Sequence, residues 1–321
     1  KMFTHRPDCF GQLGVAREIA GILGNQFVSP EWYVDTPKFG GDDDRLSLTV
    51  KNDVSDKVSR FMAVVVSDVK VAPSPIWLQA ELVRLGSKPI NNIVDVTNYV
   101  MLITAQPMHA YDYDKIASGK LGVRLANKGE QVALLNGKVE ELNDNDIVIT
   151  DGKKVIGLGG VMGGSETEVS SDTKNIILEC ANFDMYTIRR TSMHYGLFTD
   201  AVTRFTKGQS PLQIPAVMQL ALKSVFDVAG GQQASKVIDD QNLQTFSELV
   251  VHAPQSINKD FINQRLGLSL SQKEIESLLG NVEFTFDVNY VAPFWRTDIE
   301  IAEDVVEEVG RLYGFDKLPQ D

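Results

Sequence analysis

The stretch GLGGVMGGSE, residues 157–166, begins the part of the chain that decides the fold and the candidate site. Five glycines stand within eight positions, which costs backbone entropy unless bare main chain must approach something closely. An apolar run over residues 176–178 follows and ends on the carboxylate of Glu179. Burying a carboxylate is expensive unless hydrogen-bond donors meet it. Together these features predict a cavity floored by main-chain N–H groups, with the Glu179 side chain aimed inward.

Two nucleotide-binding patterns compete with this interpretation of the glycine run. A phosphate-binding loop needs a lysine after its last glycine, but Gly164 is followed by serine and glutamate. A dinucleotide fold needs a crossover helix before the acidic residue, and residues 163–175 show no helical apolar stripe. We reject both patterns. A glycine-rich β-turn without a ligand stays open as the alternative.

Composition limits the class of protein. With 321 residues, 43% of them hydrophobic, the chain can bury a large core and form two or three domains. No apolar run approaches the roughly 18–20 residues that span a bilayer, and no secretory leader is seen. Cys9 and Cys180 make no disulfide framework, so we expect a reducing, cytoplasmic setting. The net charge of −12 argues against broad, charge-driven binding of nucleic acid.

Helix signals recur along the chain as apolar residues at three- and four-residue spacing. They predict helices within residues 6–24, from Ser74-Pro75 to Gly86, and from Ser210-Pro211 to residue 230. The apolar stripe of the first helix is formed by Leu13, Ala16, Ile19, Ala20 and Leu23.

Strand signals fill much of the remaining chain before residue 235. Alternating apolar residues predict strands over residues 46–50 and 62–71. Asn-Gly at 136–137 and Asp-Gly at 151–152 are typical of hairpin turns. Residues 88–101 are rich in β-branched side chains and are ambiguous between helix and strand.

The last seventy residues have a different organisation. A short helix is expected over residues 256–267, and Ser271 with Glu274 forms a capping box for a second helix that ends at Gly280. Two strands follow within residues 282–295, and then a helix over residues 299–312. This order predicts a small winged-helix-like module.

Several polar residues outside the glycine run are candidates for chemistry. His109 could transfer a proton, although lone histidines are commonly structural. Thr97 and Asn98 could hold a water molecule, or could equally cap a helix. Four cations flank the predicted cavity and could contact a phosphate backbone or form an ordinary solvated surface; they are Arg189, Arg190, Arg204 and Lys207.

The last predicted helix has an unusual acidic face. Asp304, Glu307 and Glu308 are three and four residues apart and share one side, and Asp298 is a candidate cap. Like-charge neighbours destabilise a helix by roughly 0.2–0.5 kcal/mol each, so a divalent cation or a cationic partner would relieve them. The alternative is a solvated acidic face in an acidic protein.

Six long motifs resemble the beta subunit of bacterial phenylalanyl-tRNA synthetase, in order and over nearly the whole chain. They are VDVTNYV (94–100), AQPMHAYD (105–112), GLGGVMGG (157–164), ILECANF (177–183), RRTSMHYGLFTDAVTRFTKG (189–208) and RTDIEIAEDVVEEVGRLYGF (296–315).

The resemblance implies an order of domains. Residues 1–35 would be the C-terminal part of an N-terminal domain, residues 47–235 the editing domain and residues 248–321 the winged-helix-like domain, with linkers over residues 36–46 and 236–247. The expected fold class is therefore α+β. It combines an editing domain, built on a mixed or antiparallel sheet, with a small winged-helix-like domain.

The resemblance also implies a hydrolytic editing site for tyrosine attached by mistake to tRNA(Phe). Glu179 matches the family's acceptor for the phenolic hydroxyl, with N–H groups of the glycine run as donors. Thr199 and Ala201 match positions that line the pocket. The substrate-binding residues implied are Glu179, Thr199, Ala201, Gly159, Gly160 and Gly163.

The remaining candidate residues take on roles through the same resemblance. His109, Thr97 and Asn98 match the cluster near the scissile ester and its attacking water, and are the catalytic residues implied. The family's magnesium-binding positions correspond to Asp298, Asp304, Glu307 and Glu308. This match favours Mg²⁺ over a solvated acidic face.

The implied partners are the alpha subunit of phenylalanyl-tRNA synthetase and tRNA(Phe), in an alpha2-beta2 heterotetramer away from membranes. ATP would be used by the whole synthetase and not bound by this chain, because the amino-acid-activating site belongs to the alpha subunit. The chain lacks an initiator Met and its last predicted helix nearly reaches its end, so we expect a fragment. The alternative function is a non-catalytic binding or assembly module.

Overall fold

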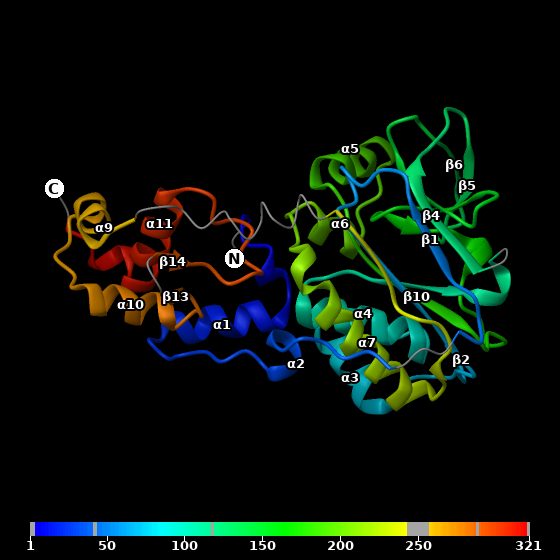
Figure 1. Cartoon of the computed structure of the whole chain (residues 1–321), viewed down its shortest axis with the longest axis horizontal. Coiled ribbons are helices and arrows are strands. Elements are labelled where there is room, and N and C mark those ends of the chain that lie inside the picture. Colours follow the sequence, from blue (N-terminus) through cyan, green and yellow to red (C-terminus); the bar gives the residue numbers. More distant parts are fainter. Residues whose placement is uncertain (1–3, 41–43, 117–118, 243–256, 287–288, 320–321) are drawn as a thin grey trace.

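The computed structural model describes residues 4–40, 44–116, 119–242, 257–286 and 289–319 of the chain. It has two lobes (Figure 1). The larger lobe contains the two main sheets, and the smaller one contains the last helices together with the N-terminal segment. Both lobes combine helices with antiparallel or mixed sheets, which confirms the expected α+β class.

The central sheet of the larger lobe is buried on both faces. Its strand order is β11-β2-β10-β3, and β12 also pairs with β2. Side chains of β2 alternate between two cores, with Phe61, Ala63 and Val65 in one and Met62, Val64 and Val66 in the other. The bounds are β2 Arg60–Ser67, β3 His109–Asp112, β10 Ile176–Asn182, β11 Gln232–Gln233 and β12 Ile238–Gln241.

Three helices cover one face of this sheet (Figure 1). They are α3 Ile76–Arg84, α4 Asn92–Thr104 and α7 Ile214–Ala229. The predicted helices after Ser74-Pro75 and Ser210-Pro211 are confirmed. The ambiguous stretch over residues 88–101 is helical from Asn92 onward. The side chain of Asn91 accepts from the N–H groups of Ile93 and Val94 and caps α4.

One described helical stretch, Pro211–Ala229, is long and apolar enough to cross a membrane by length and composition alone. Half of it is buried inside the protein, where its apolar side chains pack in the core beneath the central sheet. Core helices commonly have this composition, so the stretch is weak evidence for a membrane span.

A second sheet packs on the other face of the central sheet, together with helices α5 and α6. Only its β1–β4 pair is parallel. The Asp-Gly turn at 151–152 joins β7 to β8 and the Asn-Gly turn at 136–137 joins β5 to β6, so both predicted hairpin turns are confirmed. The strands of this sheet, in order, are β1 Thr49–Asn52, β4 Lys120–Leu125, β7 Ile147–Thr150, β8 Val155–Leu158 and β9 Met162–Gly163. The strands β5 Gln131–Ala133 and β6 Val139–Glu141 form a separate two-stranded sheet, and the helices are α5 Met185–Tyr195 and α6 Asp200–Phe205.

The smaller lobe contains three helices and a short hairpin around a core of its own. The capping box of Ser271 and Glu274 is present, as predicted. The hairpin strands are much shorter than expected, and the first helix is capped by Asn258; the predicted start at residue 256 lies outside the described residues. The bounds are α9 Lys259–Leu266, α10 Gln272–Gly280, β13 Thr285–Phe286, β14 Tyr290–Val291 and α11 Ala302–Tyr313.

One expectation about the chain's organisation is wrong, and the N-terminal helix packs in an unexpected way. The predicted linker over residues 236–247 contains β12, which pairs with β2 inside the central sheet. The N-terminal helix α1, Gln12–Ile22, does not bury its apolar stripe; Ile19 and Leu23 are exposed. It buries Gly14, Arg17, Glu18 and Gly21 instead, because its partners are the charged and close-packed groups of the smaller lobe.

Candidate functional site

A cavity of about 530 Å³ lies between the two sheets of the larger lobe. Its walls come from α4, β3, β10, the glycine-rich β8–β9 turn and the start of α6. The volume is within the range of about 300–1,000 Å³ that is typical of small-molecule sites. The nine residues predicted to be catalytic or to bind substrate are scattered between positions 97 and 201 of the sequence, and all nine line this cavity: Thr97, Asn98, His109, Gly159, Gly160, Gly163, Glu179, Thr199 and Ala201.

Strand register brings the acid and the histidine together. Glu179 on β10 is the cross-strand partner of His109 on β3, and Tyr111 is two residues further along β3 on the same face. Directly opposed residues of an antiparallel pair have Cβ atoms roughly 4.5–5.5 Å apart. The Tyr111 hydroxyl donates a hydrogen bond of 2.5 Å to Oε2 of Glu179. The rings of His109 and Tyr111 meet edge to face at 4.5 Å.

The apolar surroundings change the protonation of this pair. Burial raises the pKa of Glu179 to about 7, and the hydrogen bond from Tyr111 acts in the opposite direction. Burial lowers the pKa of His109 to about 4. At neutral pH, His109 is therefore uncharged and Glu179 is divided between its acid and carboxylate forms.

Thr97 and Asn98 reach the cavity from α4. Both lie inside this helix, so neither is its cap. The Thr97 hydroxyl donates to the carbonyl of Val94 at 2.8 Å, which leaves its oxygen lone pairs to accept a hydrogen bond. The predicted role of this pair in holding a water molecule stays a prediction.

The main contribution of the glycine run is to leave room for neighbouring side chains, and it supplies few hydrogen-bond donors to the cavity. A Cβ on Gly163 would lie 2.5 Å from Cε1 of His109, and one on Gly160 would lie 2.8 Å from Cδ1 of Ile188. The expected donor role is wrong for Gly159, because its N–H group donates to the Ile147 carbonyl at 2.9 Å. These residues are glycine because side chains pack directly against their backbone.

Thr199 and Ala201 line the cavity from the first turn of α6. The Thr199 hydroxyl accepts from the N–H of Val202 and donates to the carbonyl of Val161, so it both caps the helix and ties it to the glycine-rich turn. Its oxygen is thus largely committed within the fold. Thr199 shapes the wall, while Ala201 leaves room beside it.

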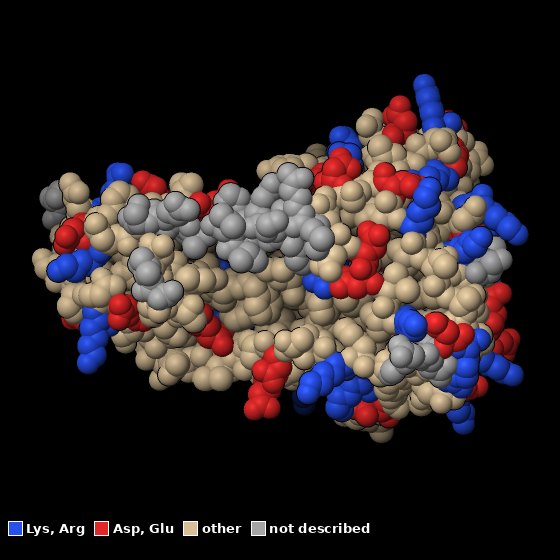
Figure 2. Space-filling view, viewed as in Figure 1, with Lys and Arg blue, Asp and Glu red and all other residues tan. Residues whose placement is uncertain are grey.

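The four predicted RNA-binding cations do not form one exposed patch. Arg189 and Arg190 on α5 are exposed. The prediction is wrong for Arg204, which is buried and bound to the Asp200 carboxylate at 2.9 Å. The Lys207 ammonium lies over the ring of Phe10 at 5.5 Å. On the face in view, basic and acidic side chains are interspersed over the larger lobe and form no broad basic surface (Figure 2).

The four carboxylates predicted to bind Mg²⁺ are not gathered into a ligand set. Asp298 accepts two hydrogen bonds from Arg296, both of 2.8 Å, and Glu308 accepts two more from the same guanidinium group. Asp304 caps α11 by accepting from the N–H of Ile301, and Glu307 is exposed. No group of three or more candidate ligands that could hold a metal exists within the described ranges. Arginine neutralises the two most buried of the four acids, Asp298 and Glu308, in this structure.

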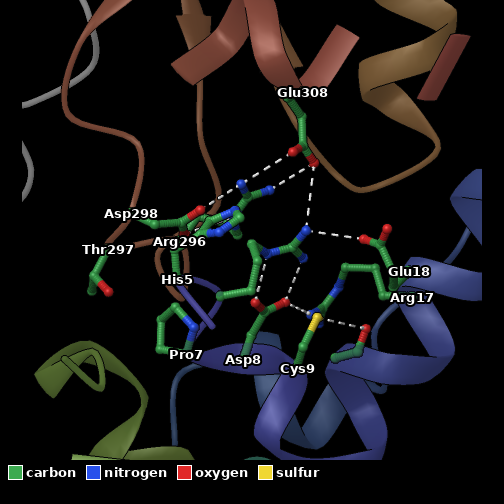
Figure 3. Close-up of polar contacts among 12 residues, drawn as sticks. His5, Pro7, Asp8, Cys9, Arg17, Glu18, Arg296, Thr297, Asp298 and Glu308 are labelled. Carbon is green, nitrogen blue, oxygen red and sulfur yellow. Dashed lines mark hydrogen bonds and ion pairs between the residues drawn. The ribbon is translucent and has the colours of Figure 1, made fainter. Parts of the chain in front are cut away.

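These arginine contacts belong to a buried network within the smaller lobe (Figure 3). Arg6 binds Asp8 and Glu18 at 2.9–3.0 Å, and Arg311 binds both Glu18 and Glu308. The network therefore joins the N-terminal segment to α11. Charge pairing explains why α1 turns charged residues inward.

Sequence reasoning missed Tyr111 as part of the site. It is 2% exposed and packs in the core between the sheets. The available signal was its position two residues from His109, which places both on one face of a strand. That signal required knowing that residues 109–112 form a strand.

Comparison with models of known domain families identifies the family of this chain. Residues 57–230 match the family model of the B3/4 domain, and residues 255–315 match that of the tRNA synthetase B5 domain. The chain belongs to the B3/4 domain family and carries a B5 domain behind it. The B3/4 match includes every residue that lines the cavity.

The chain is also similar to curated beta subunits of one enzyme, phenylalanine–tRNA ligase. The chain is 38% identical to the phenylalanine–tRNA ligase beta subunits of Bacillus cereus and Halalkalibacterium halodurans, and 37% identical to that of Staphylococcus aureus. The resemblance to this beta subunit is confirmed. Each alignment covers 98% of this chain and 39% of the relative, so the chain spans well under half the length of these proteins.

A solved N-terminal fragment of the phenylalanyl-tRNA synthetase beta-subunit from Pyrococcus horikoshii is also similar. It is 18% identical with a TM-score of 0.44, over 97% of this chain and 85% of that chain.

Proposed function

We propose that this chain is the editing portion of a phenylalanine–tRNA ligase beta subunit and hydrolyses the ester of tyrosyl-tRNA(Phe). The observation that carries the proposal is the buried Glu179 carboxyl group beside His109 in a cavity of small-molecule size. A pocket made for phenylalanine rejects an added hydroxyl by only about a hundredfold in comparable cases. A second site that recognises the hydroxyl would remove the error.

Selectivity would come from the Glu179 carboxyl group. The phenolic hydroxyl of tyrosine donates a hydrogen bond, whereas phenylalanine leaves the buried acceptor without a partner. An unmet buried polar group costs about 1–3 kcal/mol, and more when it is charged. The apolar walls would bind either ring, so this difference decides which ester is held.

Hydrolysis would depend on positioning more than on a strong base. With a pKa of about 4, His109 is a weak base at neutral pH. It would orient the attacking water together with Thr97 and Asn98, aided by the terminal ribose hydroxyl of the tRNA. Correct orientation of reactants lowers the barrier for so labile an ester.

The proposed partners are tRNA(Phe) and the alpha subunit, in a cytoplasmic heterotetramer. Arg189 and Arg190 are the predicted RNA-binding cations that remain exposed, so they would contact the phosphate backbone. ATP would be used by the whole synthetase. The arginine contacts of Asp298 and Glu308 give no support to Mg²⁺ at those carboxylates.

The test is deacylation of preformed tyrosyl-tRNA(Phe) by the wild-type chain and by Glu179→Ala. We expect slow hydrolysis by the wild type, because the curated relatives contain much more chain with which to hold tRNA, and a loss of at least about tenfold in the variant. Glu168→Ala is the matched control, because Glu168 lines the same cavity but is exposed. It should keep wild-type activity.

Two other results would argue against this function. Equal deacylation by the wild type and Glu179→Ala would remove Glu179 from the mechanism. Saturable tyrosine binding without any ester hydrolysis would favour a non-catalytic binding module.

A further inference from the structure

Only one of the two oxygens of the Glu179 carboxyl group accepts a hydrogen bond from the described part of the protein. Oε2 accepts from the Tyr111 hydroxyl at 2.5 Å. Within the described part of the chain, no other donor contacts this carboxyl group, and Oε1 is not among the buried polar atoms without a partner. Since Glu179 lines the cavity, Oε1 is left for a ligand.

We propose that Tyr111 is a positioning residue that determines the specificity of this site. Its hydroxyl holds Glu179 as a hydrogen-bond acceptor and leaves one oxygen for one phenolic hydroxyl of the ligand. The carboxyl group would then be shared by two phenols, one from the protein and one from the bound tyrosine. This inference rests on the proposed function and names the residue that prepares the site for it.

The fold holds Tyr111 in this place. Its cross-strand partner is Ile177, and its side chain lies in the core between the sheets together with Ile177. The edge of its ring meets His109. A buried tyrosine needs a hydrogen-bond partner, and at 2% exposure its hydroxyl cannot turn to bulk water. Tyr111 and Glu179 therefore fix each other's orientation.

The consequence for recognition follows from the protonation of Glu179. A carboxylate only accepts hydrogen bonds, whereas a protonated carboxyl group also donates one and discriminates less well for a donor. Burial favours the protonated form and raises the pKa of Glu179 to about 7, while the Tyr111 hydrogen bond favours the carboxylate. Without the Tyr111 hydroxyl, the acceptor form would need a higher pH.

The experiment measures tyrosine binding by calorimetry across neutral pH for the wild type, Tyr111→Phe and Tyr113→Phe. We expect Tyr111→Phe to bind tyrosine about tenfold more weakly at neutral pH, and its affinity to rise at a higher pH than that of the wild type. Tyr113→Phe is the matched control. Tyr113 is two residues away, but its hydroxyl donates to the main-chain carbonyl of Ser47 outside the cavity.

A second measurement needs no ligand. The titration of the Glu179 carboxyl carbon can be followed by ¹³C NMR in the free protein, with Glu179→Gln to assign the signal. Its midpoint should move to higher pH in Tyr111→Phe and stay unchanged in Tyr113→Phe.

The outcomes separate this inference from the function on which it rests. Identical titration midpoints, or identical pH profiles of tyrosine binding, in the wild type and Tyr111→Phe would overturn the role of Tyr111. The other informative result is a shifted Glu179 titration midpoint in Tyr111→Phe together with no tyrosine binding by the wild type at any pH. That result would support the positioning of Glu179 by Tyr111 and contradict the proposed function.

Discussion

Glu179 shows how one residue carries both the candidate function and a stability cost. It occupies a core position on β10, between Leu178 and Cys180, where its strand neighbours are fully buried. Its carboxyl group has an ordinary pKa of 4.5 and a pKa of about 7 in the folded protein. Between these values the unfolded chain releases the proton and the folded chain keeps it, so the stability from this group falls as pH rises.

Glu179→Gln should therefore stabilise the fold at alkaline pH relative to acidic pH. The difference in free energy of unfolding, variant minus wild type, should grow by up to about 3 kcal/mol between pH 4.5 and roughly pH 8. Urea denaturation at a series of pH values measures it. The contribution of His109 is present in both proteins and cancels. A difference that stays flat over this range would contradict the raised pKa.

Helices and strands were predictable wherever their ends carry local signals. The capping box at Ser271 and the hairpin turns at 136–137 and 151–152 depend on residues a few positions apart. The buried face of α1 did not follow from its apolar stripe. Its surroundings come from Val282 and Leu312, far along the chain, and they require Gly21 at the contact.

At the scale of strands β8 and β9, we predict that the glycine run sets the position of His109, because the ring of His109 packs against the backbone of Gly163. Gly163→Ala puts a Cβ 2.5 Å from the His109 ring, whereas Gly157→Ala makes only ordinary contacts from 3.4 Å. We expect Gly163→Ala to lose about 1–3 kcal/mol of stability and most tyrosine binding, since overpacking displaces the ring. Thermal melts and calorimetry measure both effects.

Gly157→Ala is the control for this change, because Gly157 also lines the cavity and lies in the same β8–β9 ladder. It should retain tyrosine binding. If both variants behave alike, the close packing of Gly163 on His109 is not what shapes the site.

At the scale of the whole molecule, buried charge joins the N-terminal segment to α11, near the other end of the chain, within the smaller lobe. Arg296 is buried and binds Asp298 and Glu308, and Arg6 and Arg311 extend the contacts to the N-terminal segment. Removing one member of such a set leaves charges in the interior without partners. The contact between the N-terminal segment and α11 is therefore sensitive to a single substitution in this network.

Arg296→Met should destabilise the chain by roughly 3–5 kcal/mol, since two carboxylates lose their guanidinium partner. Arg265→Met, which removes an exposed pair with Glu303, should cost less than about 1 kcal/mol. Denaturant midpoints compare the two variants. A wild-type melting temperature that rises with added Mg²⁺ would contradict the assignment of these carboxylates to Arg296.

The sequence by itself determined the α+β class, the family and the membership of the cavity. Each of these is written in local patterns or in motifs several residues long, such as the glycine run and the strand that contains Glu179. Only the tertiary structure decided how the polar groups pair. Arg296 binds Asp298 and Glu308, two of the acids expected to bind metal. Arg204 is buried and binds Asp200. Tyr111 donates a hydrogen bond to Glu179, which lies 68 positions away in the sequence. The pairing of polar side chains depends on which distant residues meet in the low-dielectric interior. Neither the spacing of residues along the chain nor its composition contains that information.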